Sequence, residues 1–257
     1  MLYKYKYKYK YKYNMTKYTV LGTSKKDGFG AQYIANICCY IKCRNEGKLY
    51  KHIPYTSIDH NYDNNSNYPI QLNTFTGLKS DDLSNINDVD IEEIISGWQY
   101  PLTYNDNTDK YINEIREMYY STCKPEPISC DVAIHIRRGD VSKSRNQQRF
   151  IELEYYSNII EKLIHEHGEN IKIIVFSQGK LDDFQELSMY NNNIKFMLNT
   201  NLLESFHSMV KAPIFVMGYS ALSCCIALLS NNTVYYTHSN TWSKQCIPKK
   251  KEWIYIK

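Results

Sequence analysis

From residue 132 onward, short apolar runs alternate with longer amphipathic segments. Runs rich in Val, Ile and Phe predict strands, and segments of roughly ten residues with apolar positions three or four apart predict helices. The predicted strands are 132–136, 171–176, 194–198, 214–217 and 233–236, and the predicted helices between them are 153–167, 181–189, 202–210 and 221–229. This alternation predicts a parallel sheet with helices on both faces.

The first half of the chain is patterned less regularly. A short strand is expected at 18–21, followed by a Gly-rich turn and an amphipathic helix from about residue 31 to 43. Asp-rich helix-start chemistry precedes Ile91, Ile94 and Ile95 in the segment 79–96, and a helical pattern covers 109–120. The segment 124–129, with two prolines, is typical of a link between domains. We therefore expect an N-terminal α/β domain over 15–127 and a C-terminal α/β domain over 128–257.

Composition and charge restrict the class of protein. The chain has 257 residues, of which 43% are hydrophobic and 23% are charged, as in ordinary globular proteins. Its net charge is +4, but the five lysines of an alternating Tyr/Lys segment contribute +5, which leaves 4 − 5 = −1 elsewhere. That segment, within residues 1–14, is expected to be a disordered tail. The body is not basic, so nucleic acid is not an expected partner.

The positions of the cysteines and the hydropathy of the chain indicate in which cellular compartment the protein is expected. The eight cysteines include no C-x-x-C pair and cluster within apolar patterns, so we expect reduced, packed thiols. The apolar run 212–229 is interrupted by Pro213, Gly218, Ser220 and Ser223, which favours a strand, a turn and a buried helix over a membrane span. The tail has no apolar core typical of a signal peptide. A soluble or cytoplasmic protein without a transmembrane segment is predicted.

The end of the predicted strand 132–136 carries the first candidate chemistry, in the sequence HIRRGD. In an extended chain His135 and Arg137 point to one face and Arg138 to the other, so the first two can converge on one ligand. Arg forms planar, charged contacts with phosphate oxygens, and His can bond a base or a sugar. A surface ion-pair cluster with Asp140 and Glu152 is the alternative. Two adjacent arginines at the end of a strongly apolar strand favour the anion site.

A second candidate site follows the predicted strand 214–217. Gly218 permits a tight turn, Ser220 can cap the next helix, and Ser223 lies in its first turn. Backbone N–H groups at a helix start attract anions such as phosphate. Capping alone also explains these residues. Ligands of parallel sheets bind at the carboxyl ends of the strands. Two candidate anion sites at such strand ends in one sheet favour a diphosphate ligand, which could use both.

These residues carry a resemblance to a known family. HIRRGD resembles the H-x-R-R-x-D motif of the α-1,2- and α-1,6-fucosyltransferase superfamily. In matching order, FSQG at 176–179, the run 206–230 and Trp253 resemble further signatures of these enzymes, and DGFGAQ at 27–32 is similar to their Gly-rich opening loop. Pro213 stands where related sequences usually carry Asp, and Leu222 where Phe is common. The resemblance covers most of residues 18–257.

The resemblance implies a GT-B-like fold with two Rossmann-like domains, each a parallel sheet flanked by helices. It further implies an inverting glycosyltransferase that moves fucose from GDP-fucose to a glycan or other hydroxyl acceptor without a metal or other cofactor. Position by position, His135 would contact the guanosine side of the donor and Arg137 the β-phosphate, with Arg138 and Asp140 supporting that loop. The remaining implied donor- or substrate-binding residues are Gly28, Gly30, Gln32, Ser220 and Ser223.

Several alternatives remain open from the sequence. Asp88 and Asp90 form a D-x-D of the kind that holds Mn²⁺ in GT-A glycosyltransferases, although helix capping explains them better. A non-catalytic protein that binds a sugar nucleotide or a glycan is the main rival. The general base is not identified: Asp140, Glu152 and Glu154 lie near the motif, and a carboxylate of the first domain could also serve.

Overall fold

The computed structural model describes residues 18–21, 27–59, 65–84, 91–94, 107–237 and 253–256. In the N-terminal half, three strands form a parallel sheet in the order β2-β1-β3. The elements of this half are β1 (Tyr18–Leu21), α1 (Phe29–Asn45), β2 (Leu49–Lys51), α2 (Tyr68–Thr76), β3 (Ile91–Ile94) and α3 (Thr108–Tyr120).

The C-terminal half contains a six-stranded, fully parallel sheet in the order β6-β5-β4-β7-β8-β9. Its strands are β4 (Val132–Ile136), β5 (Ile173–Ser177), β6 (Ile194–Leu198), β7 (Ile214–Val216), β8 (Thr233–Tyr236) and β9 (Ile254–Tyr255). Its helices are η3 (Gln147–Arg149), α4 (Leu153–His167), η4 (Leu181–Tyr190), α5 (Leu202–Lys211) and α6 (Ala221–Leu229). The strand order reverses at β4: β5 and β6 lie on one side of it, and β7, β8 and β9 lie on the other.

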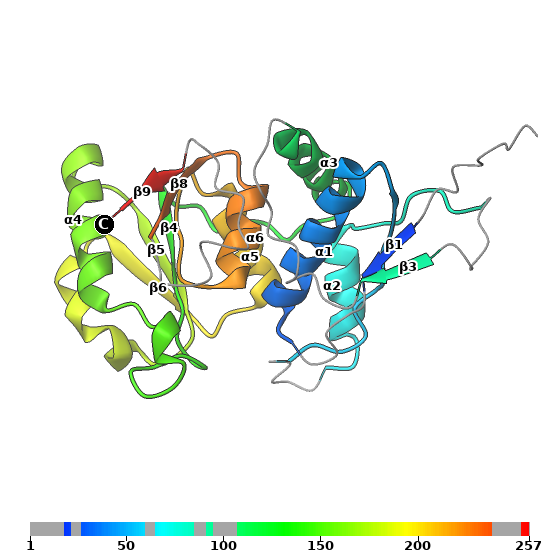
Figure 1. Ribbon diagram of the computed structural model, residues 1–257. Helices are drawn as coiled ribbons and strands as arrows, with labels where there is room; N and C mark the ends of the chain where they lie inside the picture. The colour runs from blue at the N-terminus through cyan, green and yellow to red at the C-terminus, as the bar shows by residue number, and fades with distance from the viewer. Residues whose placement is uncertain are drawn as a thin grey trace, which may run out of the picture.

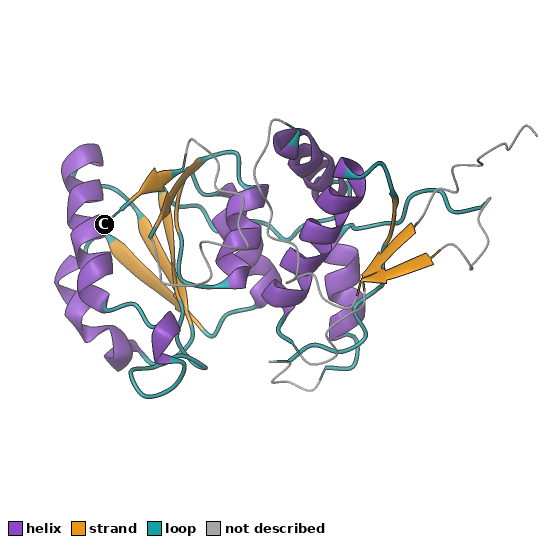
Figure 2. Cartoon of the chain, in the orientation of Figure 1, coloured by secondary structure: helices purple, strands orange, loops and turns teal. Residues whose placement is uncertain are grey.

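The elements are stacked in layers (Figure 1). Helix α4 covers one face of the six-stranded sheet, and α5 and α6 cover the other. Helices α1, α2 and α3 follow on the far side of α6, with the small sheet beyond them, as the orange strands and purple helices of Figure 2 show. Helix α1 packs against both α6 and α3, so the two halves meet along helices rather than through a loop alone.

Two hydrophobic clusters follow from this layering. Strand residues alternate between them: Val132 and Ile134 pack with α4 and η4, whereas Ala133 and Phe215 face α5 and α6. The second cluster continues without a break into α1, α2 and α3 of the N-terminal half. Both faces of the larger sheet are therefore buried, which explains why its strands are apolar at nearly every position.

Most of the predicted elements are confirmed. The strands 132–136, 194–198 and 233–236 and the helices 153–167 and 221–229 have the predicted bounds, as does the strand 18–21. The parallel sheet with helices on both faces is also confirmed. The predicted link 124–129 has neither helix nor strand. The predicted tail, residues 1–14, lies outside the described residues.

The prediction of a helix start before Ile91 is wrong. Residues Ile91–Ile94 form β3, which pairs with β1 along its whole length. The sequence Ile-Glu-Glu-Ile fits one face of a helix, but its β-branched residues also suit a strand, and the neighbouring β1 decides between them. The segment 181–189 also differs from expectation, because it is a 3₁₀ helix with a kink at Phe184.

Candidate active site

The predicted site residues gather where the order of the large sheet reverses. His135 lies at the end of β4, and Gly218 and Ser220 follow the neighbouring strand β7. Carboxyl ends of parallel strands lie at one edge of the sheet, and ligands of such folds bind where the strand order reverses. The two strand ends that the sequence predicts to bind anions, after β4 and after β7, therefore lie at the same edge of the sheet.

His135 is fixed by the first turn of α6. Its Nδ1 lies 2.5 Å from Ser223 Oγ, and that oxygen also accepts a hydrogen bond from Gly218 N at 3.1 Å. A Cβ on Gly218 would lie 2.4 Å from the carbonyl oxygen of His135, so only glycine fits there. Burial, with the charge of Arg137, lowers the pKa of His135 to about 4. His135 is therefore neutral at physiological pH.

Arg137 and Asp140 form an ion pair in the loop after β4. Arg137 Nε donates to Asp140 Oδ1 at 3.2 Å, and Nη2 donates to Oδ2 at 2.6 Å. Asp140 thus holds one edge of the guanidinium, and among the described residues no hydrogen bond engages Nη1. Asp140 orients the guanidinium of Arg137, and this pairing disfavours Asp140 as a general base.

Arg138 faces away from His135, as the alternation of an extended chain predicts. Its guanidinium donates to the carbonyl oxygens of Arg137 at 3.0 Å and Ile151 at 2.9 Å, and it lies 4.1 Å from the centre of the Phe150 ring. Burial lowers its pKa. Arg138 therefore stabilises the loop between β4 and α4 through its bonds to the backbone.

The first turns of α1 and α6 are in direct contact. A Cβ on Gly30 would lie 2.5 Å from the backbone nitrogen of Leu222, and Cys225 Sγ lies 3.4 Å from the carbonyl oxygen of Gly30. Ser220 caps α6 by accepting a hydrogen bond from Leu222 N at 3.1 Å. Two helix N-termini, each with a partial positive charge, therefore lie beside the end of β4.

Gln32 and Gly28 shape the start of α1. The side-chain amide of Gln32 donates to the carbonyl oxygens of Asp27 at 2.8 Å and Ser57 at 2.9 Å. Gly28 N donates to Asp27 Oδ1 at 2.8 Å, and Asp59 N donates to the carbonyl oxygen of Asp27 at 3.1 Å. The carboxylate of Asp27 is thereby held at the opening loop, and the backbone of Asp59, whose side chain is exposed, is held beside it. Sequence reasoning missed both, although Asp27 begins the DGFGAQ motif.

The other carboxylates near the motif lie elsewhere. Glu152 and Glu154 are exposed at the start of α4, on the sheet face opposite α6, and Glu152 pairs with Lys143 at 2.9 Å. Pro213 precedes β7, at the strand end away from Gly218. The departure from the family pattern at Pro213 therefore lies at the edge of the sheet opposite the one that carries His135 and Gly218.

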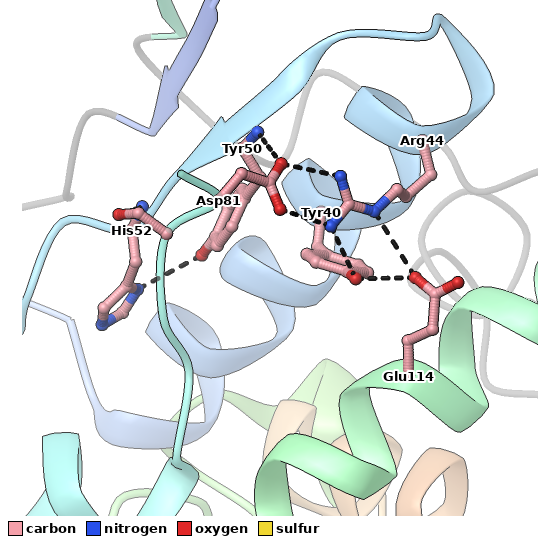
Figure 3. A network of polar contacts seen from close by, with 7 residues as sticks. Tyr40, Arg44, Tyr50, His52, Asp81 and Glu114 are labelled. Carbon is pink, nitrogen blue, oxygen red and sulfur yellow. Dashed lines mark hydrogen bonds and ion pairs between the residues drawn. The ribbon is translucent and has the colours of Figure 1, made fainter. Parts of the chain in front are cut away.

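A polar network fixes β2 to α1 and α3 in the N-terminal half (Figure 3). Arg44 donates two hydrogen bonds to Asp81, at 2.7 and 2.6 Å, and lies 3.4 Å from Glu114, which also accepts from Tyr40 OH. Burial opposes ionisation of Asp81, but bonds from Arg44 and from the backbone of Tyr50 lower its pKa. The network ties the last turns of α1 to α3 and, through Asp81, to the backbone of β2.

The described residues show no metal centre and no membrane span. No group of three or more His, Cys, Asp or Glu side chains among them is placed to hold a metal ion. Asp88 and Asp90 lie outside the described residues. In the described part of the chain, every helix is too short or too polar to cross a bilayer. The seven cysteines described there are free thiols, and all except Cys123 are buried.

Comparison with known proteins gives the family. Residues 97–257, more than half of the chain, match the model of glycosyl transferase family 11. The matched segment contains β4 with the HIRRGD motif, β7 and α6, all of which contribute to the site. The chain therefore belongs to glycosyl transferase family 11, and it is a glycosyltransferase by family.

Three solved structures have a similar overall chain path. E. coli heptosyltransferase WaaC with ADP is 9% identical, with a TM-score of 0.49 over 93% of this chain and 92% of that one. POFUT1 in complex with GDP is 11% identical, with a TM-score of 0.46 over 87% and 98%. Fucosyltransferase NodZ from Bradyrhizobium is 8% identical, with a TM-score of 0.38 over 84% and 93%.

The match to the apo form of POFUT1 spans only 48% of that chain and 51% of this one. All of these TM-scores are below 0.5, so the assignment to the family rests on the sequence match over residues 97–257. No curated protein matches the chain.

Proposed function

We propose that this protein is an inverting, metal-independent fucosyltransferase that moves fucose from GDP-fucose to a hydroxyl of a glycan acceptor. The observation that carries the proposal is the position of His135 at the reversal point of the sheet: it lies beside the charge of Arg137 and contacts the first turn of α6, which packs on the first turn of α1. The family match supports glycosyl transfer. The similar structures named POFUT1 and NodZ include complexes with GDP or GDP-fucose, which agrees with this donor.

The proposed reaction develops negative charge on the β-phosphate as the bond from the sugar to the diphosphate breaks. Fixed Arg and helix-terminal donors can stabilise that charge in place of a metal ion. Asp140 holds the Nε and Nη2 edge of Arg137, so Nη1 is the nitrogen best placed to reach an oxygen of the diphosphate. Neutral His135, bonded at Nδ1, would present Nε2 to the guanosine side of the donor.

Inversion requires a base that takes the proton of the attacking acceptor hydroxyl. Asp140 is paired with Arg137, and Glu152 and Glu154 lie on the other face of the sheet. We propose that the base comes from the N-terminal half, at Asp27 or Asp59, because both flank the start of α1 where it meets α6. The acceptor would then bind on the N-terminal side of this contact.

The donor assignment is tested by comparing nucleotides. GDP is expected to raise the melting temperature more than UDP, CMP or ADP, because a site that bonds to the base edge rejects other bases. At about 100 times its dissociation constant a ligand stabilises the native state by roughly 2.7 kcal/mol, a shift of a few degrees in scanning fluorimetry. Equal shifts for GDP and UDP would contradict the assignment. Binding of GDP without any transfer or hydrolysis of GDP-fucose would instead favour a non-catalytic protein.

Metal independence has a separate test. Transfer measured in excess EDTA is expected to match transfer without chelator, since Arg137 and the two helix starts supply the charge stabilisation. Loss of transfer that Mn²⁺ restores would contradict the proposal and favour a role for Asp88 and Asp90.

A further inference from the structure

Arg116 connects the N-terminal half to the C-terminal end of α6. It lies on α3 and is 5% exposed. Its Nη2 donates to the carbonyl oxygens of Leu228 and Ser230, both at 2.7 Å, and its Nε donates to that of Leu229 at 3.1 Å. The guanidinium is itself oriented by Asn113, whose Oδ1 accepts from Nη1 at 2.7 Å.

These bonds satisfy a specific need of α6. The last carbonyl groups of a helix have no partner within the helix, and the helix dipole makes that end favourable for a cation. Helix α6 ends at Leu229 and is capped at Ser230, so Arg116 supplies both hydrogen bonds and positive charge where they are required. The planar guanidinium of Arg can donate to three carbonyl groups at once. The ammonium of Lys is a compact point charge and cannot reproduce this arrangement of hydrogen bonds.

The other end of α6 lies in the candidate site. Ser220 and Ser223 are at its start, and Ser223 contacts His135. A helix of nine residues is only about 13 Å long, so a shift at its C-terminal end is transmitted to its first turn. The N-terminal half thus fixes α6 at both ends, through Gly30 of α1 at the start and Arg116 of α3 at the finish.

We propose that Arg116 is a positioning residue for the nucleotide-sugar site, acting through α6 on Ser223 and His135. This inference rests on the proposed function.

The test compares Arg116→Met and Arg116→Lys with a control of similar destabilisation, Leu163→Ala. Leu163 is fully buried in α4, in the cluster on the opposite face of the sheet. GDP affinity is measured by calorimetry well below the melting temperature of every variant. Arg116→Met is expected to weaken GDP binding about tenfold, a smaller effect than the roughly hundredfold loss of rate that a 1 Å misplacement of reacting groups can cause. Arg116→Lys is expected to fall between Arg116→Met and the wild type, and Leu163→Ala to bind like the wild type.

Amide hydrogen exchange provides a second measurement, which does not depend on GDP. Arg116→Met is expected to accelerate exchange along α6 from Cys224 onward more than in α4, whereas Leu163→Ala should do the reverse. If the wild type binds GDP and both Arg116 variants bind it equally well, the positioning role is overturned while the proposed function stands. If the wild type binds no GDP, the proposed donor falls, and the positioning role falls with it. If Arg116→Met does not fold, Arg116→Lys decides between these outcomes.

Discussion

Arg137 and Arg138, which are adjacent at the end of β4, have different partners and different roles. Arg138 is buried against Phe150 and bonded to two backbone carbonyl oxygens, so its positive charge shapes a loop. Arg137 is held along one edge by Asp140, with both side chains about one-fifth exposed. An oriented, partly exposed guanidinium can bind a phosphate with little rearrangement. The different surroundings of the two side chains therefore assign the proposed donor contact to Arg137.

Replacement of Arg137 tests that assignment. Arg137→Ala is expected to lower transfer by about two to three orders of magnitude, the usual effect of removing one charge-stabilising donor. Arg137→Lys should also be strongly impaired, because an ammonium cannot keep the Asp140 pairing and reach the phosphate together. Steady-state rates are compared with those of Arg145→Ala, an exposed arginine of the same loop, which should be near normal. Near-normal turnover in folded Arg137→Ala would remove Arg137 from the donor site.

Two histidines with lowered pKa values make stability depend on pH. Burial, with nearby cationic side chains, lowers the pKa of both His135 and His207 to about 4. In the unfolded chain a His titrates near pH 6.5, so between about pH 6.5 and 4 the unfolded state binds protons that the folded state does not. Stability is therefore expected to fall as pH decreases through this window, by on the order of 3 kcal/mol for each histidine at its lower end.

Urea unfolding at pH 7.5 and 4.5 measures this loss. The variants His135→Asn and His207→Asn keep a polar group near the position of Nδ1, and His207 Nδ1 lies 2.8 Å from Tyr119 OH in the wild type. The double variant should lose less stability than the wild type between the two pH values. An equal loss in both proteins would show that other groups control the acid response.

At the scale of the elements, the contact between α1 and α6 depends on one missing side chain. Gly30 lies in the first turn of α1, where a Cβ would approach the backbone of Leu222 within 2.5 Å. Backbone atoms cannot move aside without shifting the helix, so the close approach of the two helix starts requires glycine. The opening loop and the end of β4 are brought together by this contact.

Gly30→Ala is accordingly expected to separate the two helix starts. Alanine usually favours a helix over glycine, yet here overpacking should destabilise the fold by about 1–3 kcal/mol and weaken GDP binding. Asn158→Ala, exposed on α4, serves as the control and should stay within about 0.5 kcal/mol of the wild type. Chemical denaturation and nucleotide titration measure the two effects. A stabilised Gly30→Ala protein with unchanged GDP binding would contradict the role of the contact.

Some of these elements can be predicted from the sequence and others cannot. Strands such as 132–136 are apolar at nearly every position because both faces of the sheet are buried, so their pattern is unambiguous. In Ile91–Ile94 the same residues suit a helix or a strand, and only pairing with β1 decides. The HIRRGD motif makes His135 and Arg137 candidate site residues directly from the sequence, and their roles stay predictions. The bonds of Arg116 join residues more than 110 positions apart, and no local pattern predicts them.

At the scale of the whole molecule, two sheets share one hydrophobic core. The cluster on the α5 and α6 face of the large sheet includes Phe206 and Cys225 together with Tyr33, Phe75 and Tyr119 from the N-terminal half. Phe206 packs its ring against Phe29, Phe75 and Tyr119. One sheet lies within each of the predicted domains, 15–127 and 128–257, but neither half encloses this cluster alone.

A shared core predicts a single unfolding transition. If the halves were independent domains, each would melt at its own temperature, as separate cores allow. Here the loss of either half would expose the apolar side of α1 or of α6, so neither is expected to remain folded without the other. Differential scanning calorimetry of the full chain should show one peak with equal calorimetric and van't Hoff enthalpies, and residues 128–257 produced alone should lack cooperative melting. Two resolved peaks, or a cooperatively folded fragment, would show that the contact along α6 joins two domains that fold independently.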